Sequence, residues 1–279
     1  RMIGPSLGEA NIARGFAALG MRTAPLPLAI RTSAEGQRRA CIWDGWCDAG
    51  CPIGALANPL VTYLPRALAA GAQLRHHATV TEILTDASGA RATGVNWREE
   101  SGAARSAEAA VVVLAASTTQ NSRLLLASRS RSPHGLANSS GQVGRNLMIH
   151  NNGIVLAYSA RPNPSTFQKA ILIPDFYHGA DDSPHPLGAI QNMGKADPLL
   201  LADAVGDDLG KDGKDAEHFA GHIIDFFITA EDLPSFDNRV AVDSEGNIRL
   251  HYTQNNLEAY RRLREKLIGI MDKVAENEG

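Results

Sequence analysis

The run of apolar residues at 109–116 places the strongest constraint on the fold of this 279-residue chain. Its central part, Ala110 to Leu114, has the length of a strand and lacks the polar–apolar alternation of a half-exposed strand. Small residues follow from Ala115 to Asn121, and a helix is predicted from Ser122 to Ser128. We therefore predict a strand covered on both faces, as in an α/β sheet, leading into a helix N-terminus. Such a helix start suits an anion or a nucleotide.

The rest of the chain combines helical and strand patterns. Beyond about residue 150, proline, glycine and acidic residues become frequent, and short strands alternate with loops, which predicts a second region built on an antiparallel sheet. Helices are predicted over 7–19, 58–70 (kinked at Pro65) and 257–274, and further strands over 73–76, 79–84 and 92–97.

All three cysteines of the chain lie in one short segment, as Cys41, Cys47 and Cys51, with the spacing C-x5-C-x3-C. Thiols placed this closely are typical of a site where sulfur holds a metal or a cluster. Gly45 and Gly50 let the backbone bend around a bound group, and a proline follows the last cysteine, as in iron–sulfur ligand runs. The segment predicts a three-cysteine metal site, and we expect the three sulfurs to converge on one point.

Other interpretations of this segment stay open. A disulfide would leave one cysteine over, and disulfide scaffolds are usually short and cysteine-dense. Zinc usually takes four ligands, so a fourth would come from elsewhere, with His76 and His77 the nearest histidines. In a further interpretation, the three thiols bind nothing and are simply buried, reduced and inert.

Composition excludes several classes of protein. The chain carries 27 Lys and Arg against 30 Asp and Glu, so no basic surface indicates a nucleic acid or an anionic membrane as partner. No apolar run reaches the roughly 18–20 residues that cross a bilayer, and no membrane span is expected. With 44% hydrophobic residues, the chain can form one large or two modest globular domains.

Several motifs together resemble the glucose–methanol–choline (GMC) family of flavoprotein oxidoreductases. They are Gly50–Ala55 with Leu60–Ala72, Val111–Ser128, Gly135–Ser140, Val143–Met148 with His150, and Glu231–Pro234 with Asn238–Asp243. The chain departs from the family by having Ser117 where the family has glycine, and Asn121-Ser122 where it has Ser-Pro.

The resemblance implies an α/β (α+β overall) protein with two domains. Residues 1–150 would form part of a Rossmann-like FAD-binding domain that includes the cysteine loop at 41–52. Residues 151–279 would form an antiparallel-sheet substrate domain that ends on the C-terminal helix.

The resemblance also places the FAD site. In the family, a V-x-x-I strand offers its main chain to the adenine, and Val80 falls at that position. The turn formed by Ala115, Ala116, Ser117 and Thr118 is expected to line the same site, because its small residues allow close approach of the cofactor.

The implied activity is FAD-dependent oxidation of the CH–OH group of an alcohol, a sugar or a sugar acid. The cysteine run is similar to that of the flavoprotein subunit of bacterial gluconate and sugar dehydrogenase complexes, where a [3Fe-4S] cluster on three cysteines passes electrons from FAD to a cytochrome. This implies Cys41, Cys47 and Cys51 as cluster ligands, and a cytochrome c subunit and a small accessory subunit as partners. The implied location is periplasmic, membrane-associated through a partner, or otherwise cytoplasmic.

Two family features are not found in the sequence. It contains no G-x-G-x-x-G fingerprint, and the catalytic histidine of the family, with its His or Asn partner, would follow the last residue, Gly279. We therefore expect the middle part of a longer enzyme, with no catalytic residue of its own and no activity in isolation. The alternatives are an oxidase of the same family that uses O2, or a non-catalytic module that holds a metal for electron transfer or structure.

Overall fold

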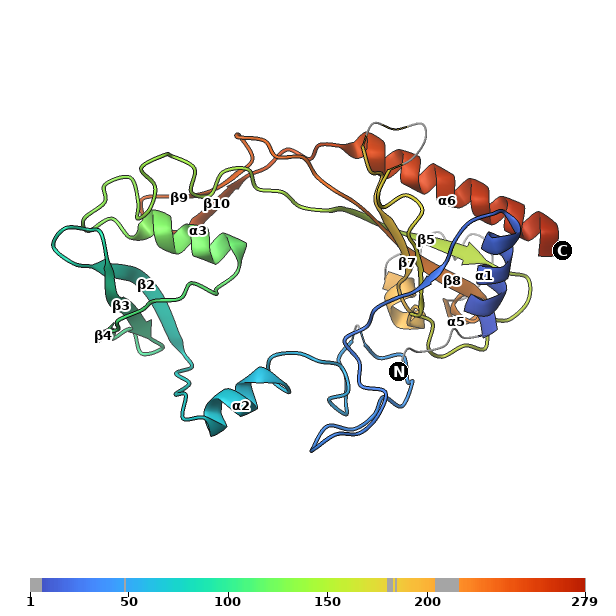
Figure 1. Ribbon diagram of the computed structural model, residues 1–279, viewed down its shortest axis with the longest axis horizontal. Coiled ribbons are helices and arrows are strands. Elements are labelled where there is room, and N and C mark those ends of the chain that lie inside the picture. The colour runs from blue at the N-terminus through green and yellow to red at the C-terminus, as the bar shows by residue number, and fades with distance from the viewer. Residues whose placement is uncertain (1–6, 48, 180–182, 184, 204–215, 279) are drawn as a thin grey trace. The chain divides into compact units, whose positions relative to one another are not determined.

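The computed structural model describes residues 7–47, 49–179, 183, 185–203 and 216–278 (Figure 1). The chain forms two compact units, each described here by itself. The first contains Arg1–Gly71, His150–Glu231 and Asn256–Gly279, and the second contains Ala72–Ile149 and Asp232–Asn255. The predicted boundary at residue 150 coincides with one crossing of the chain between the units, but each unit combines segments that lie far apart in the sequence.

The first unit is built on a five-stranded antiparallel sheet with the order β1-β6-β7-β8-β5. Strands β8 and β5 pair along their whole length, from Asn151 opposite Ala230 to Tyr158 opposite Ile223. The antiparallel sheet predicted beyond residue 150 is present, and an N-terminal strand also joins it. The strands are β1 (Ala24–Pro25), β5 (Asn151–Tyr158), β6 (Ile171–Ile173), β7 (Ala189–Asn192) and β8 (Ile223–Ala230).

Two helices complete the main core of this unit, α1 (Leu7–Ala18) and α6 (Leu257–Glu278). Helix α6 contacts β5 and β8, and α1 contacts α6. Leu263 and Leu267 are fully buried one helical turn apart, as the amphipathic pattern predicts. They share a core with Phe16, Phe226 and Ile228, and burial of this apolar surface is the main stabilising contribution of the unit.

Two shorter helices also belong to the first unit. Helix α5 (Ala216–Ala220) packs with Leu201 and Ile223 in a smaller cluster. Helix α2 (Tyr63–Ala69) is shorter than predicted and buries no residue. The predicted kink at Pro65 is wrong, because this proline lies in the first turn, where its missing N–H has no helical partner to lose.

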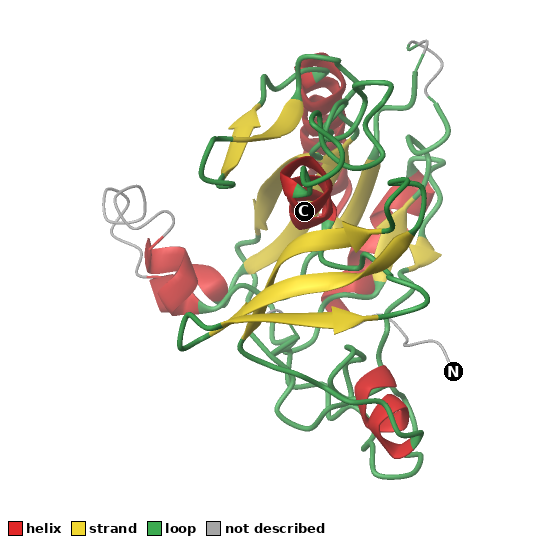
Figure 2. Ribbon diagram, turned by 90° about the vertical axis from the view of Figure 1, so that its left-hand side faces the viewer, coloured by secondary structure: helices red, strands yellow, loops and turns green. Residues whose placement is uncertain are grey.

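The second unit combines a three-stranded antiparallel sheet, a helix and a two-stranded sheet (Figure 2). Helix α3 packs against β2 and β9, and the buried side chains of this unit include Ile83, Trp97 and Leu124. The Ser128 hydroxyl at the end of α3 accepts a hydrogen bond from the Ile83 N–H at 2.9 Å, which fixes the helix to β2. The elements are β2 (Ala78–Thr85), β3 (Ala92–Glu99), β4 (Ala104–Glu108), α3 (Thr118–Ala127), β9 (Arg239–Val242) and β10 (Ile248–His251).

Two predicted strands, 73–76 and 110–114, are not formed. Several of their apolar side chains are exposed instead, Leu74 by 58%, Val111 by 75% and Val113 by 79%, while Val112 and Leu114 are half-buried. A strand requires a neighbour that pairs with its backbone N–H and C=O groups, and neither segment has one among the described residues. The strand pairs formed by the described residues are all antiparallel, so the expected parallel sheet is not found among them. The predicted mixture of helices and strands is confirmed.

Candidate functional site

The three cysteines line one small hollow in the first unit. Cys41, Cys47 and Cys51 surround it together with Ile30 and Leu56, among other residues. All three are half-buried and none of them forms a disulfide, so the disulfide interpretation does not describe this structure. One loop thus places three cysteines around a common hollow, although Asp48 of this loop lies outside the described residues.

Backbone N–H groups approach two of the sulfurs. The Trp43 N–H donates to Cys41 Sγ at 3.3 Å, and the Leu56 N–H donates to Cys51 Sγ at 3.4 Å. The Leu56 N–H, with smaller contributions from those of Ile53, Ala55 and Gly54, lowers the pKa of the Cys51 thiol against the opposing effect of burial. The donors at Cys51 stabilise its thiolate, which is the form of cysteine that binds metal.

The cysteine loop is attached to the segment that follows β5. The Trp43 ring lies edge-on to the Phe167 ring with 5.2 Å between centroids, and the Thr166 hydroxyl donates to the Trp43 carbonyl oxygen at 3.3 Å. Gly45 has a φ of 80°, and a Cβ atom there would overlap the Thr166 carbonyl oxygen. Gly45 therefore has a second role besides the predicted bending of the loop: because it has no Cβ atom, the Thr166 backbone can approach it closely.

The expected convergence of the three sulfurs on a single point is not observed. Among the described residues, no three His, Cys, Asp or Glu side chains are arranged to hold a metal ion. Two of the sulfurs are oriented by their backbone donors instead. His76 and His77, considered as a fourth zinc ligand, belong to the second unit, where His77 Nδ1 lies 3.2 Å from a Glu100 carboxylate oxygen.

In the second unit, the predicted flavin turn lies at the start of α3. Ala115, Ala116, Ser117 and Thr118 are all exposed. Ser117 has φ 77° and ψ 163°, a conformation that is essentially restricted to glycine. The backbone therefore keeps the shape that glycine would allow at this position, although the side chain here is serine.

Asn121 holds this turn, a role that sequence reasoning did not predict. Its Oδ1 atom accepts a hydrogen bond from the Ala116 N–H at 2.9 Å, and its Nδ2 atom donates to the Leu114 carbonyl oxygen at 3.4 Å. Its own backbone N–H donates to the Ser117 carbonyl oxygen at 2.8 Å. The one signal in the sequence was the departure from the Ser-Pro pair of the family at this position.

Val80, the other predicted flavin residue, is connected to the same helix. Its carbonyl oxygen accepts a hydrogen bond from Arg123 Nη2 at 2.9 Å, and Arg123 Nε donates to Gln120 Oε1 at 2.6 Å. The structure therefore brings Val80 and the turn at 115–118 to one helix, although 43 residues separate Val80 from Arg123.

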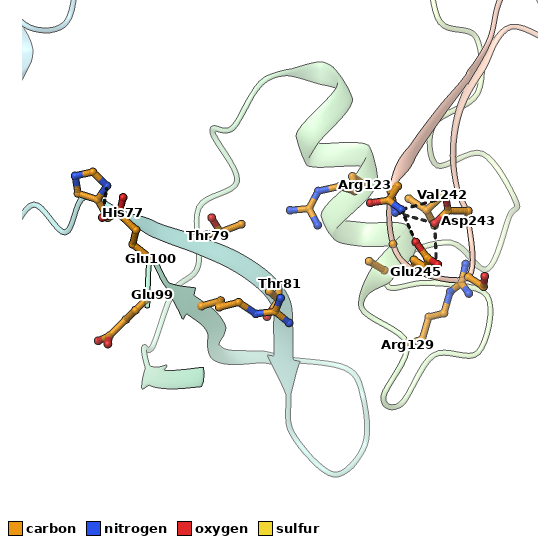
Figure 3. Close-up of a pocket in the computed structure, with 15 residues that line it drawn as sticks. His77, Thr79, Thr81, Glu99, Glu100, Arg123, Arg129, Val242, Asp243 and Glu245 are labelled. Carbon is orange, nitrogen blue, oxygen red and sulfur yellow. Dashed lines mark hydrogen bonds and ion pairs between the residues drawn. The ribbon is translucent and has the colours of Figure 1, made fainter. Parts of the chain in front are cut away.

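An open cavity of about 710 Å³ lies beside β2 in this unit. Figure 3 shows Arg123 extending from α3 toward β2, which carries Thr79 and Thr81. Guanidinium groups of Arg98 and Arg129 line the cavity, and so do carboxylates that include Asp243 and Glu245. Val80 and the turn at 115–118 do not belong to its lining, so this cavity differs from the predicted flavin surface.

Comparison with known proteins defines the class of this chain. The model of the GMC oxidoreductase family matches residues 10–152. The chain therefore belongs to the GMC oxidoreductase family, and membership implies FAD as the cofactor.

Three curated relatives agree with this assignment. A 2-methyl-1,2-propanediol dehydrogenase from Mycolicibacterium austroafricanum is 32% identical over 84% of this chain and 44% of its own length. The fructose dehydrogenase large subunit of Gluconobacter japonicus is 31% identical over 56% of this chain and 28% of its own length. A 6'''-hydroxyparomomycin C oxidase from Streptomyces lividus is 36% identical over 47% of this chain and 24% of its own length. The chain spans less than half the length of these relatives.

Proposed function

We propose that this chain is part of an FAD-dependent oxidoreductase that acts on the CH–OH group of an alcohol, a sugar or a sugar acid. The observation that carries the proposal is the exposed turn at the start of α3, where Ser117 retains the backbone conformation of the family glycine. Family membership and the names of the relatives support the same class of reaction.

The residues of the turn fit the cofactor. Ala115 and Ala116 are small and exposed, so a planar group can approach their backbone closely, and Ser117 and Thr118 place hydroxyl groups beside them. Val80 would present its main chain to the adenine. When bound, FAD would supply the hydride-accepting chemistry.

We further propose that Cys41, Cys47 and Cys51 hold a [3Fe-4S] cluster. The shared hollow and the N–H groups directed at the Cys41 and Cys51 sulfurs support this proposal, since such hydrogen bonds stabilise cluster thiolates. In a cluster each thiolate binds a different iron, so its ligands need not surround one point as those of a single zinc ion do. The donor set fits the group in chemistry, and closure around a cluster would require the sulfurs to reorient.

A cluster of this kind would carry electrons one at a time to a cytochrome c subunit. A small accessory subunit would complete the complex. The complex would lie in the periplasm and be attached to the membrane by a partner. The relative named a fructose dehydrogenase large subunit supports a multi-subunit assembly. No helix of the described residues is long and apolar enough to cross a bilayer. The relative named an oxidase favours a second candidate, transfer of electrons to O2.

The test uses the full-length protein, purified without oxygen and analysed for FAD, iron and the electron paramagnetic resonance signal of an oxidised [3Fe-4S] cluster. Cys47→Ala should lose iron and the signal but keep FAD. Asp44→Asn, which changes another residue lining the hollow, should keep all three. Protein with FAD but no iron would refute the cluster, and protein without FAD would refute the proposed function. Turnover with cytochrome c as the electron acceptor would support the dehydrogenase, and turnover with O2 would support the oxidase.

A further inference from the structure

The side chain of Asn121 replaces a missing strand neighbour for the flavin turn. Segment 110–114 pairs with no strand among the described residues, yet the Leu114 carbonyl and the Ala116 N–H are both satisfied by one amide side chain. An amide can do this because its oxygen accepts while its nitrogen donates, as a peptide group does. Ala115 is thereby held between two fixed backbone groups.

Arg123 provides the corresponding connection to β2. Its guanidinium is held at Nε by the Gln120 side chain and reaches the Val80 carbonyl oxygen through Nη2. A planar guanidinium fixed at two points has little freedom left, so it sets the position of its acceptor more narrowly than a lysine would. Figure 3 shows this side chain extending from α3 toward β2.

Asn121 and Arg123 lie two residues apart on α3, and each contacts one part of the predicted flavin surface. We infer that they are positioning residues of the flavin site: Asn121 holds the turn at 114–116, and Arg123 holds the Val80 carbonyl in register with it. This inference rests on the proposed FAD site. Both residues act through the backbone that they hold, so their loss should weaken FAD binding.

The test measures FAD affinity of the full-length apoprotein by quenching of flavin fluorescence, together with the midpoint of thermal unfolding without FAD. Asn121→Ala and Arg123→Gln should each weaken FAD binding by about tenfold, because each removes a hydrogen bond that orders the site. Asn121→Asp keeps the acceptor for the Ala116 N–H and loses the donor to Leu114. Its affinity should therefore lie between those of the wild type and Asn121→Ala.

Two matched controls come from the same unit. Asn138 also bridges two backbone groups, donating to the His134 carbonyl oxygen at 2.8 Å and accepting from the Val143 N–H at 3.0 Å. Arg129 also donates from Nε to a nearby group, the Leu126 carbonyl oxygen at 2.8 Å. Asn138→Ala and Arg129→Gln should lower thermal stability comparably to the test variants while FAD affinity stays within twofold of the wild type.

Equal FAD affinity in the wild type, Asn121→Ala and Arg123→Gln would overturn the inference and leave the proposed function standing. Equal weakening in the control variants would also overturn it, because the effect would then be general destabilisation. If Asn121→Ala does not fold, Asn121→Asp and Arg123→Gln decide by the same criteria. A wild-type protein that binds no FAD would instead refute the proposed function itself.

Discussion

The indole ring of Trp43 lies edge-on to the phenyl ring of Phe167, with 5.2 Å between the ring centroids and 78° between the ring planes. Phe167 is buried, and the next residue, Gln168, accepts a hydrogen bond from Asn163 Nδ2 at 2.6 Å. The cysteine loop therefore rests on a segment that has its own internal support in the first unit.

Phe167→Ala should remove the surface against which Trp43 packs. We expect the free energy of unfolding to fall by about 3 kcal/mol, as for other buried phenylalanines, and the cysteines to react faster with a thiol reagent. Chemical denaturation and thiol labelling check the two effects. Phe219→Ala is the control, because Phe219 stacks on Tyr158 and not on Trp43, and it should change thiol reactivity little. Slow labelling in Phe167→Ala would show that Phe167 does not hold the loop.

Ser117→Gly should stabilise the protein. A non-glycine residue in this backbone region costs on the order of 1–3 kcal/mol of stability, and glycine would remove that strain. Glycine has greater conformational entropy in the unfolded chain, and this offsets about 0.5–1 kcal/mol of the stability regained. The net expectation is an increase of about 1 kcal/mol in the free energy of unfolding, measured by urea denaturation. A decrease would mean that the Ser117 hydroxyl, which lies 3.5 Å from the Thr119 hydroxyl, contributes more than the strain costs.

Asp225 should make stability fall as the pH rises toward neutrality. Burial raises the pKa of this carboxyl group from 3.8 to about 7, against the opposing effects of the Ala196 N–H and the Lys195 charge. The folded chain therefore holds a proton that the unfolded chain releases between about pH 4 and pH 7. This stabilisation is complete below about pH 4 and is lost as the pH rises through 7. Its size is at most about 4 kcal/mol.

Asp225→Asn should remove this pH dependence, because an amide keeps the shape of the side chain and does not ionise. The difference in free energy of unfolding between the variant and the wild type, measured at several pH values, should increase in favour of the variant from pH 4 to pH 8. A difference that stays constant across this range would contradict the raised pKa.

Two glycines should respond in opposite directions to alanine. Gly188 has a φ of 136°, and an added Cβ would overlap the Thr229 carbonyl oxygen of the neighbouring strand, so Gly188→Ala should cost more than about 2 kcal/mol. Gly269 lies within α6 with open space around its Cα, so Gly269→Ala should stabilise by about 0.5–1 kcal/mol. Thermal denaturation of both variants measures the contrast, and a stable Gly188→Ala would mean that β7 and β8 can separate at this point.

Much of the local structure follows from the sequence alone. The helical spacing of apolar residues predicted α1 and α6, and the strand patterns at 79–84 and 92–97 predicted β2 and β3. The spacing of the three cysteines predicted a shared metal site, and the structure places all three residues around one hollow without the expected convergence of their sulfurs. These features depend on residues close together in the chain, so periodicity and turn chemistry suffice to find them.

The tertiary structure decided the features that depend on distant residues. Whether 110–114 forms a strand depends on a neighbour that supplies hydrogen bonds, and apolar composition alone did not reveal its absence from the described residues. The bond from Arg123 to the Val80 carbonyl oxygen likewise depends on how α3 packs on β2. Hydrogen bonds and packing between residues far apart in sequence arise when the chain folds, because no local preference encodes which distant groups will meet.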